Sequence, residues 1–156
     1  MHLTLHTDYA LRSLIYLGTV SDRLCAIREI AQAYDISENH LVKIIHRLGI
    51  AGFVETTRGR KGGLRLARPA DQISLGDVIR STEEDMMLVS CMRRPAGTGS
   101  CSQCRLMPDC HLKNVLAEAL DAFLAVLDQR TLADVIQDFE RKQLSDIHSQ
   151  PEREAD

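Results

Sequence analysis

The sequence predicts a mainly α-helical fold with a single β-hairpin, and three patterns in its 156 residues indicate this fold. Apolar residues recur every three or four positions in two separate blocks, one near the N-terminus and one from residue 112 onward. Two short alternating segments flank a glycine-rich turn. A cysteine-rich stretch without regular periodicity separates the two blocks. With 44% hydrophobic and 26% charged residues, the chain can bury one core.

The first block opens with a predicted helix from about residue 7 to about residue 20, which Thr7 is expected to cap. Asp8 and Arg12 fall inside the periodic stretch, and no basic region or small-residue cleavage site accompanies it. This segment is therefore interpreted as a folded helix and not as a signal peptide. No apolar run approaches the roughly 20 residues that span a bilayer. We expect a cytoplasmic protein without a membrane segment.

Two shorter amphipathic segments follow, and together they form a helix-turn-helix pattern. The first covers residues 26–34, and Asp35-Ile36 forms the turn. Ser37 is expected to cap the second, whose apolar face consists of Leu41, Ile44, Ile45 and Leu48. In such a pattern, polar residues at the start of the second helix face the major groove of DNA. The candidates for base contacts are Glu38, Asn39, His40 and Lys43.

A glycine-rich basic hairpin comes after the helix pair. Residues 53–56 and 64–67 read as paired strands, with TRGRKGG between them. From Thr57 to Arg68, five residues are basic and none is acidic, which suits contacts with phosphate groups. A hairpin that is merely solvated is the alternative. Order and spacing favour a winged helix-turn-helix DNA-binding domain with a two-stranded β wing, whose candidate phosphate contacts are Arg58, Arg60 and Lys61.

Charge is unevenly distributed along the chain. Residues 1–68 hold ten Lys and Arg against six Asp and Glu, a net charge of +4, whereas residues 69–156 hold nine against sixteen, a net charge of −7. The basic half is also the half that carries the helix-turn-helix pattern. This half is therefore expected to meet a polyanion.

The second half contains a long predicted helix whose apolar band is wider than one contact requires. It begins at Leu112, after a short helix that Ser74 is expected to cap, and residues 131–142 predict a further amphipathic helix. The band could belong to the core of one chain or to a contact with a second subunit. Because helix-turn-helix proteins usually bind symmetric half-sites, a dimerisation helix is the better interpretation. The band consists of Leu112, Val115, Leu116, Ala119, Leu120, Phe123, Leu124 and Leu127.

Four of the five cysteines lie close together, with nine, two and five residues between them. Such spacing lets several sulfurs converge on one zinc or iron-sulfur centre from a loop. Zinc is disfavoured because only one pair resembles a CxxC knuckle, and four unmetallated thiols in one loop would be an oxidation liability. Cys25 stands alone and is interpreted as a small buried residue. The clustered thiols are Cys91, Cys101, Cys104 and Cys110.

Taken whole, the chain resembles the winged-helix iron-sulfur transcriptional regulators, a family that includes IscR, RirA and the nitric-oxide-sensing repressor NsrR. The resemblance runs from Leu3 to about Ile136 and is greatest to the NsrR branch. Four stretches carry it: LTLHTDYALRSLIYL, IAQAYDISENHLVKIIHRL, TRGRKGGLRLARPADQISLGDVIRSTE and CRLMPDCHLKNVLAEALDAFLAVLDQRTLADVI.

This resemblance implies three cysteine ligands per subunit. Five residues separate the last two, and the last one is followed by x-Leu-Lys. In this sequence the matching residues are Cys91, Cys104 and Cys110, and Cys101 is an extra thiol that could substitute for Cys104. In NsrR-like proteins an aspartate of the TDYALR motif, here Asp8, completes the ligand set of a 4Fe-4S cluster from the partner subunit. Asp8 would otherwise be a first-turn acid that stabilises its helix. A 2Fe-2S cluster with His111 as a ligand is less favoured, and His111 is expected to be a polar residue at a helix start.

The function that the resemblance implies is a homodimeric repressor that binds a palindromic operator in double-stranded DNA and releases it when nitric oxide nitrosylates the cluster. An iron- or redox-responsive regulator of the RirA or IscR kind is the alternative, and a non-regulatory iron-sulfur or zinc protein is less favoured. No catalytic triad or phosphate loop suggests an enzyme. The expected organisation is a DNA-binding domain at residues 1–80, a cysteine-rich cluster-binding loop at 81–111, dimerisation helices at 112–144 and a flexible tail at 145–156.

Overall fold

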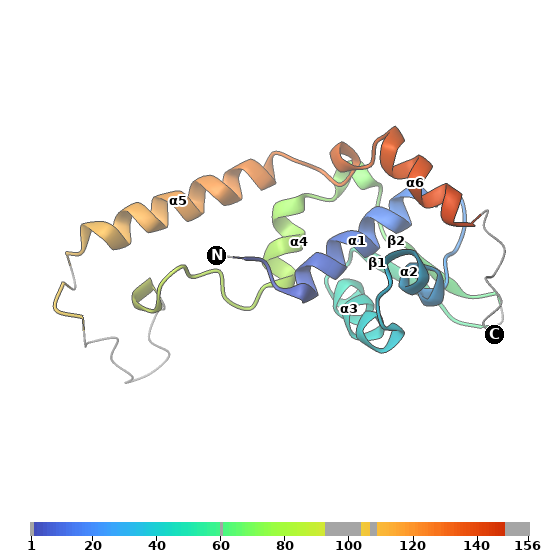
Figure 1. Ribbon diagram of the computed structural model, residues 1–156, viewed down its shortest axis with the longest axis horizontal. Helices are drawn as coiled ribbons and strands as arrows, with labels where there is room; N and C mark the ends of the chain where they lie inside the picture. Colours follow the sequence, from blue (N-terminus) through green and yellow to red (C-terminus); the bar gives the residue numbers. More distant parts are fainter. Residues whose placement is uncertain (1, 60, 93–103, 107–108, 149–156) are drawn as a thin grey trace.

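Figure 1 shows a computed structural model of the protein, which describes residues 2–59, 61–92, 104–106 and 109–148, as a helical body with one long helix that extends away from it. The α-helices are α1 (Leu5–Thr19), α2 (Ile27–Tyr34), α3 (Glu38–Ile50), α4 (Leu75–Thr82), α5 (His111–Asp128) and α6 (Asp138–His148). Short 3₁₀ turns are η1 (Ala70–Gln72), η2 (Ser90–Met92) and η3 (Ala133–Val135).

Helix α1 begins earlier than its sequence predicts, so the expected cap was wrong. Thr4 is the N-cap, and its hydroxyl accepts a hydrogen bond from the Thr7 amide. Thr7 is fully buried, and its own hydroxyl donates to the Thr82 hydroxyl at 2.9 Å. Both threonines suit a helix start, but only Thr4 lies outside the helix, because Thr7 is held by a partner 75 positions away.

The helix-turn-helix forms as predicted. Asp35 adopts the left-handed conformation with φ of 52°, which turns the chain between α2 and α3. Ser37 is the N-cap of α3, although its side chain makes no capping hydrogen bond. The four predicted apolar residues of α3, Leu41, Ile44, Ile45 and Leu48, are all buried.

Strands β1 (Val54–Thr57) and β2 (Gly63–Leu66) form the predicted antiparallel hairpin, each shifted by one residue from its expected bounds. The register pairs Val54 with Leu66 and Thr57 with Gly63. At the tip Gly59 has a φ of 114°, a conformation that side chains rarely adopt. Isolated pairing between Cys25 and Leu64 attaches the hairpin to the body.

Helix α1 lies at the centre of the body and packs against α2, α3, α4, α6 and β2. The segment after α5 also enters this core, because Leu132, Ile136 and Leu144 are buried with the side chains of α1. The single helix predicted for residues 131–142 was wrong. The Leu132 amide donates to the Ile73 carbonyl at 2.8 Å, so the chain forms η3 before α6 begins.

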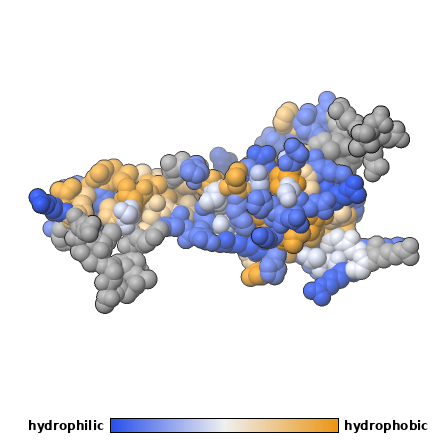
Figure 2. Space-filling model, turned by 60° about the horizontal axis from the view of Figure 1, so that its bottom comes forward, coloured by the Kyte–Doolittle hydropathy of each residue, from blue (hydrophilic) through white to orange (hydrophobic). Residues whose placement is uncertain are grey.

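Helix α5 has a different environment. The structure describes all 18 of its residues, and none of them is buried. Its C-terminal end is attached to α4 through a two-pronged contact in which the guanidinium of Arg80 donates to both carboxylate oxygens of Asp128. In Figure 2 hydrophobic residues gather over the arm at the left, where α5 lies. None of the described helices is long and apolar enough to cross a membrane.

Candidate DNA interface and metal centre

The residues predicted to read bases lie on the open side of α3. Glu38, Asn39, His40 and Lys43 are exposed in its first two turns, while the opposite side of α3 is anchored in the core. The His40 ring packs edge-on against the ring of Tyr9, with 6.3 Å between centroids. The start of α3 is therefore positioned by α1 and presents polar groups to solvent.

The exposed face of α3 also contains two residues that were not among the predicted base contacts. Val42 is 51% exposed, and His46 is exposed one turn later. Together with Asn39 and Lys43 they follow the i, i+3, i+4, i+7 spacing of one helix face. That spacing, counted from Asn39, could have identified them. An exposed valine can contact a thymine methyl group, which polar residues alone do not read.

The wing cations differ in their exposure and in the partners that the described residues give them. Arg58 and Lys61 are exposed on either side of Gly59, whereas Arg60 lies outside the described residues. Arg65 pairs with Glu55 at 2.9 Å. Arg68 lies over the Phe53 ring, with its Cζ atom 4.8 Å from the centroid. The tip of the wing therefore carries the cations that can meet phosphates, while Arg65 has a carboxylate partner and Arg68 lies on a ring with its Nε atom buried and without a hydrogen-bond partner.

The candidate cysteine ligands flank the start of α5. Cys91 lies half-buried in η2, Cys104 is exposed, and Cys110 is buried at the N-cap position of α5. All three are free thiols. Cys101 lies outside the described residues. Helix α5 and η2 pack against each other, so the first and last of these thiols come from neighbouring elements.

Within the described part of the chain, no group of three or more His, Cys, Asp and Glu side chains is close enough to hold a metal ion. The chemistry of the donor set nevertheless fits an iron-sulfur group, since thiols that are reduced and unpaired can supply thiolate ligands. Such a group would be held by Cys91, Cys104 and Cys110. His111 is exposed at the first position of α5, in agreement with its expected role.

Cys25 differs from these thiols. It is fully buried, and it pairs through its backbone with Leu64. Burial is the main reason that its pKa rises to about 12, with a further contribution from Glu29. Burial and the raised pKa both disfavour the thiolate form of Cys25 that would bind a metal. The expectation that it is a small buried residue is confirmed.

Asp8 lies in the first turn of α1 and keeps 39% of its side chain exposed. Its Oδ1 atom accepts a hydrogen bond from Arg12 at 3.0 Å, one turn along the same helix. The Arg12 guanidinium in turn lies 5.9 Å from the centre of the Tyr34 ring in α2. Asp8 is therefore accessible, and its carboxylate would exchange Arg12 for a metal if it served as a ligand.

A family model described as "Rrf2: Iron-dependent Transcriptional regulator" matches residues 3–138. The HTH-type transcriptional regulator NsrR of Bacillus licheniformis is 51% identical over 148 residues, which cover 93% of this chain and 100% of the relative. The protein of the same name from Bacillus subtilis is 47% identical over 141 residues, 90% of this chain and 93% of that one.

Solved structures of this fold also match. The IscR of T. potens has a TM-score of 0.69 at 26% identity, with 92% of this chain and 91% of that chain covered. CymR, the global cysteine regulator of B. subtilis, has a TM-score of 0.69 at 26% identity, with 87% and 96% covered.

These relatives are transcriptional regulators and not enzymes, as expected from the sequence. The mainly helical fold with its helix-turn-helix and wing agrees with them, and the chain is a DNA-binding transcriptional regulator. The family description, iron-dependent, supports an iron-containing cofactor such as an iron-sulfur group. On the match over residues 3–138, the chain belongs to the Rrf2 family of transcriptional regulators.

Proposed function

We propose that this chain forms a homodimeric repressor that senses nitric oxide through a 4Fe-4S cluster held by Cys91, Cys104 and Cys110 together with Asp8 of the partner subunit. The observation that carries this proposal is the 51% identity to an NsrR over 93% of the chain, combined with three free thiols that flank the start of α5. The DNA target is a palindromic operator.

The dimer is supported by α5. On this helix three apolar side chains, Leu112, Val115 and Val126, are each at least 60% exposed. Covering them with a second copy of the helix would remove apolar surface from water, which is favourable. Two copies related by a twofold axis would present two α3 helices to two half-sites of a palindrome. In this proposal Glu38, Asn39, His40 and Lys43 contact bases, and Arg58, Arg60 and Lys61 contact phosphates.

The bound iron-sulfur group would supply iron that a small diatomic molecule can reach, because a carboxylate is a harder and more labile ligand for iron than a thiolate. The protein's own residues join distant segments around it. Cys91 follows α4, and Cys110 begins α5. Asp8 of the partner subunit would add helix α1 of the second copy. Holding these segments together fixes the separation of the two α3 helices, and releasing them lowers the affinity for the operator.

The functional division expected from the sequence remains part of the proposal. Residues 1–80 would bind DNA, 81–111 would hold the cluster and 112–144 would dimerise. Of the tail expected at 145–156, residues up to His148 continue helix α6, and residues 149–156 lie outside the described part.

Anaerobic purification with iron and sulfide determination tests the cofactor. Contents that match one 4Fe-4S cluster per subunit are expected, and contents that match a 2Fe-2S cluster would contradict the proposed cluster type. Cys91→Ala, Cys104→Ala and Cys110→Ala should each abolish a stable cluster. Cys101→Ala is the matched control and should retain it. If Cys101→Ala loses the cluster while Cys104→Ala keeps it, Cys101 is the ligand.

Titration of the anaerobic protein with nitric oxide, followed by operator binding, tests the signal. Loss of operator affinity in proportion to the nitric oxide added is expected. The family description, iron-dependent, favours a second candidate, an iron- or redox-responsive regulator. Operator binding that responds to an iron chelator or to oxygen but not to nitric oxide would favour this second function.

A further inference from the structure

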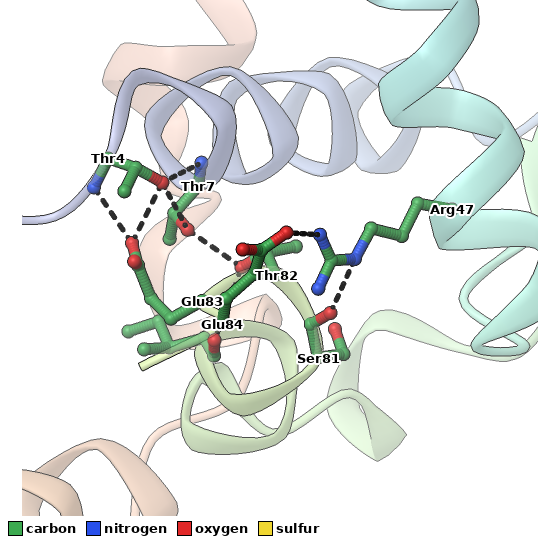
Figure 3. Close-up of polar contacts among 8 residues, drawn as sticks. Thr4, Thr7, Arg47, Ser81, Thr82, Glu83 and Glu84 are labelled. Atoms are coloured by element: carbon green, nitrogen blue, oxygen red, sulfur yellow. Dashed lines mark hydrogen bonds and ion pairs between the residues drawn. The ribbon is translucent and has the colours of Figure 1, made fainter. Parts of the chain in front are cut away.

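Arg47, in the last turn of α3, reaches across to the C-terminal end of α4. Figure 3 shows its guanidinium between two acceptors from that end. Its Nε–H donates to the Ser81 carbonyl at 2.9 Å, and its Nη1 lies 3.9 Å from Oε1 of Glu84. Ser81 belongs to the last turn of α4, where carbonyl groups have no partner within the helix. Arg47 thus caps α4 from the helix that reads DNA.

The same end of α4 is held by α1. Oε1 of Glu83 accepts hydrogen bonds from the Thr4 amide at 2.8 Å and from the Thr4 hydroxyl at 3.0 Å. The buried hydroxyls of Thr7 and Thr82 are joined at 2.9 Å. Residues 81–84 therefore form a polar junction at which α1, α3 and α4 meet, as Figure 3 shows.

The chain that leaves this junction leads directly to a candidate ligand. Helix α4 ends at Thr82, and Cys91 follows Glu84 by seven positions. Residues 83–91 are all described, and none of them belongs to an α-helix or a strand. The only regular structure there is the 3₁₀ turn η2, which contains Cys91. A short segment, residues 85–91, therefore links Cys91 to Ser81 and Glu84, the two acceptors of Arg47, and is called the tether below. A constraint on Cys91 acts on those acceptors through it.

The junction also has room to rearrange. A cavity of about 360 Å³ opens beside it and is lined by Thr4, His6, Arg47 and the carboxylates at positions 83–85. The Nε2 atom of His6 is buried there without a hydrogen-bond partner. A tightly packed apolar contact would resist a small displacement, whereas a polar contact beside a cavity can exchange its partners for water.

We propose that Arg47 is a positioning residue that couples the segment bearing Cys91 to the orientation of α3, an inference that rests on the proposed function. While Cys91 is held by a metal group, residues 81–84 stay in place and Arg47 keeps α3 set for base contacts. When Cys91 is released, the acceptors of Arg47 move with the tether and α3 loses this support. Arg47 touches neither the metal nor, in this role, the DNA bases.

The test is the ratio of operator dissociation constants for the apo and the cluster-loaded protein. Arg47→Gln should reduce this ratio by at least about fivefold, the lower range of typical coupling between two sites. Arg47→Lys keeps the positive charge but lacks the Nε–H donor, and it should reduce the ratio in the same way. A charge that merely attracts DNA would change both dissociation constants together and leave the ratio intact.

Arg23→Gln is the matched control. It removes one guanidinium that is paired with Glu29 at 2.6 Å in the same domain, away from the 81–84 junction. The ratio should stay at the wild-type value in this variant. An unchanged ratio in both Arg47 variants would overturn the coupling.

Amide hydrogen exchange of the apo protein gives a readout that needs no cluster. The Glu83 amide donates to the Ile79 carbonyl at 2.9 Å, in the turn that Arg47 caps. Its exchange should be faster in Arg47→Gln and Arg47→Lys than in Arg23→Gln, and equal rates would overturn the link between α3 and α4. If the apo and the cluster-loaded wild-type protein had the same operator dissociation constant, the proposed function itself would be contradicted. The exchange rates would then still decide whether Arg47 holds the end of α4.

Discussion

Helices α3 and α5 carry the same kind of apolar stripe, but the two stripes have opposite surroundings. On α3 the apolar residues Leu41, Ile44, Ile45 and Leu48 are buried in the core of the body. On α5, which is fully described, no residue is buried, and Leu112 is 63% exposed. One stripe is thus buried within the chain, whereas the described residues cover the other only in part.

This difference separates two sources of stability. The body, with α1 at its centre, is stabilised by a cluster of buried apolar side chains. Helix α5 buries no residue fully, and it packs against α4 and η2, with Arg80 of α4 donating to Asp128 at 2.7 Å. The exposed part of its stripe, with Leu112, Val115 and Val126, is the part that a second surface can cover. Mutations in α3 should change unfolding, and mutations in α5 should change assembly.

Replacing Leu41 with alanine should have the largest effect on stability. Leu41 is fully buried, so the truncation should lower the free energy of unfolding by about 2–5 kcal/mol. The measurement is urea denaturation, read from the midpoint at constant slope. Leu112→Ala is the comparison, and any loss beyond about 0.5 kcal/mol should depend on protein concentration, because it would come from a subunit contact. A large loss that is independent of concentration would mean that α5 packs within one chain.

Val115→Glu should break assembly without unfolding the body. Val115 is 60% exposed on the apolar band of α5, and a buried carboxylate without a partner would oppose a dimer contact there. Sedimentation should show a monomer, and operator affinity should fall by about 100-fold or more because one half-site alone remains bound. Ala125→Glu, at an exposed position on the other side of α5, is the control and should remain dimeric. A dimeric Val115→Glu would place the subunit contact elsewhere.

Wing substitutions test the basic face of the body. Arg58→Ala and Lys61→Ala should each weaken binding to every DNA sequence and reduce the salt slope by about one. Arg65→Ala should change the slope less, because Glu55 already pairs with Arg65 at 2.9 Å. Equal slopes for all three variants and the wild type would identify the hairpin as a solvated loop.

Asp8→Ala should have the smallest effect on folding. Loss of a first-turn acid and of its exposed contact with Arg12 should cost about 0.3–1 kcal/mol. If Asp8 is also a ligand, the variant should keep its fold while the absorption spectrum of the cluster and its titration with nitric oxide change. Asp8→Cys should retain iron more firmly and respond less to nitric oxide, since thiolate is the softer ligand. Identical spectra and titrations in all three proteins would return Asp8 to a purely helical role.

Much of the fold could be predicted because its signals are local. The four buried residues of α3 and the two strands followed from spacing over a few positions. The N-cap of α1 could not be predicted in this way, because Thr7 makes its hydrogen bond to Thr82, which is far along the chain. The helix predicted over residues 131–142 was wrong for the same kind of reason, since the Leu132 amide donates a hydrogen bond to the distant Ile73 carbonyl. In the site, spacing revealed which thiols could act together but not where each lies.

The sequence by itself determined most of the helices, where positive charge gathers and which thiols are candidates for iron. These properties depend on neighbours three or four positions apart and on composition. Only the tertiary structure decided that the described residues cover the stripe of α5 only in part, that Arg65 is paired with Glu55 and that Arg47 caps α4. Those facts depend on contacts between residues far apart in the sequence, which form only when the core packs, and a local sequence pattern does not specify such contacts.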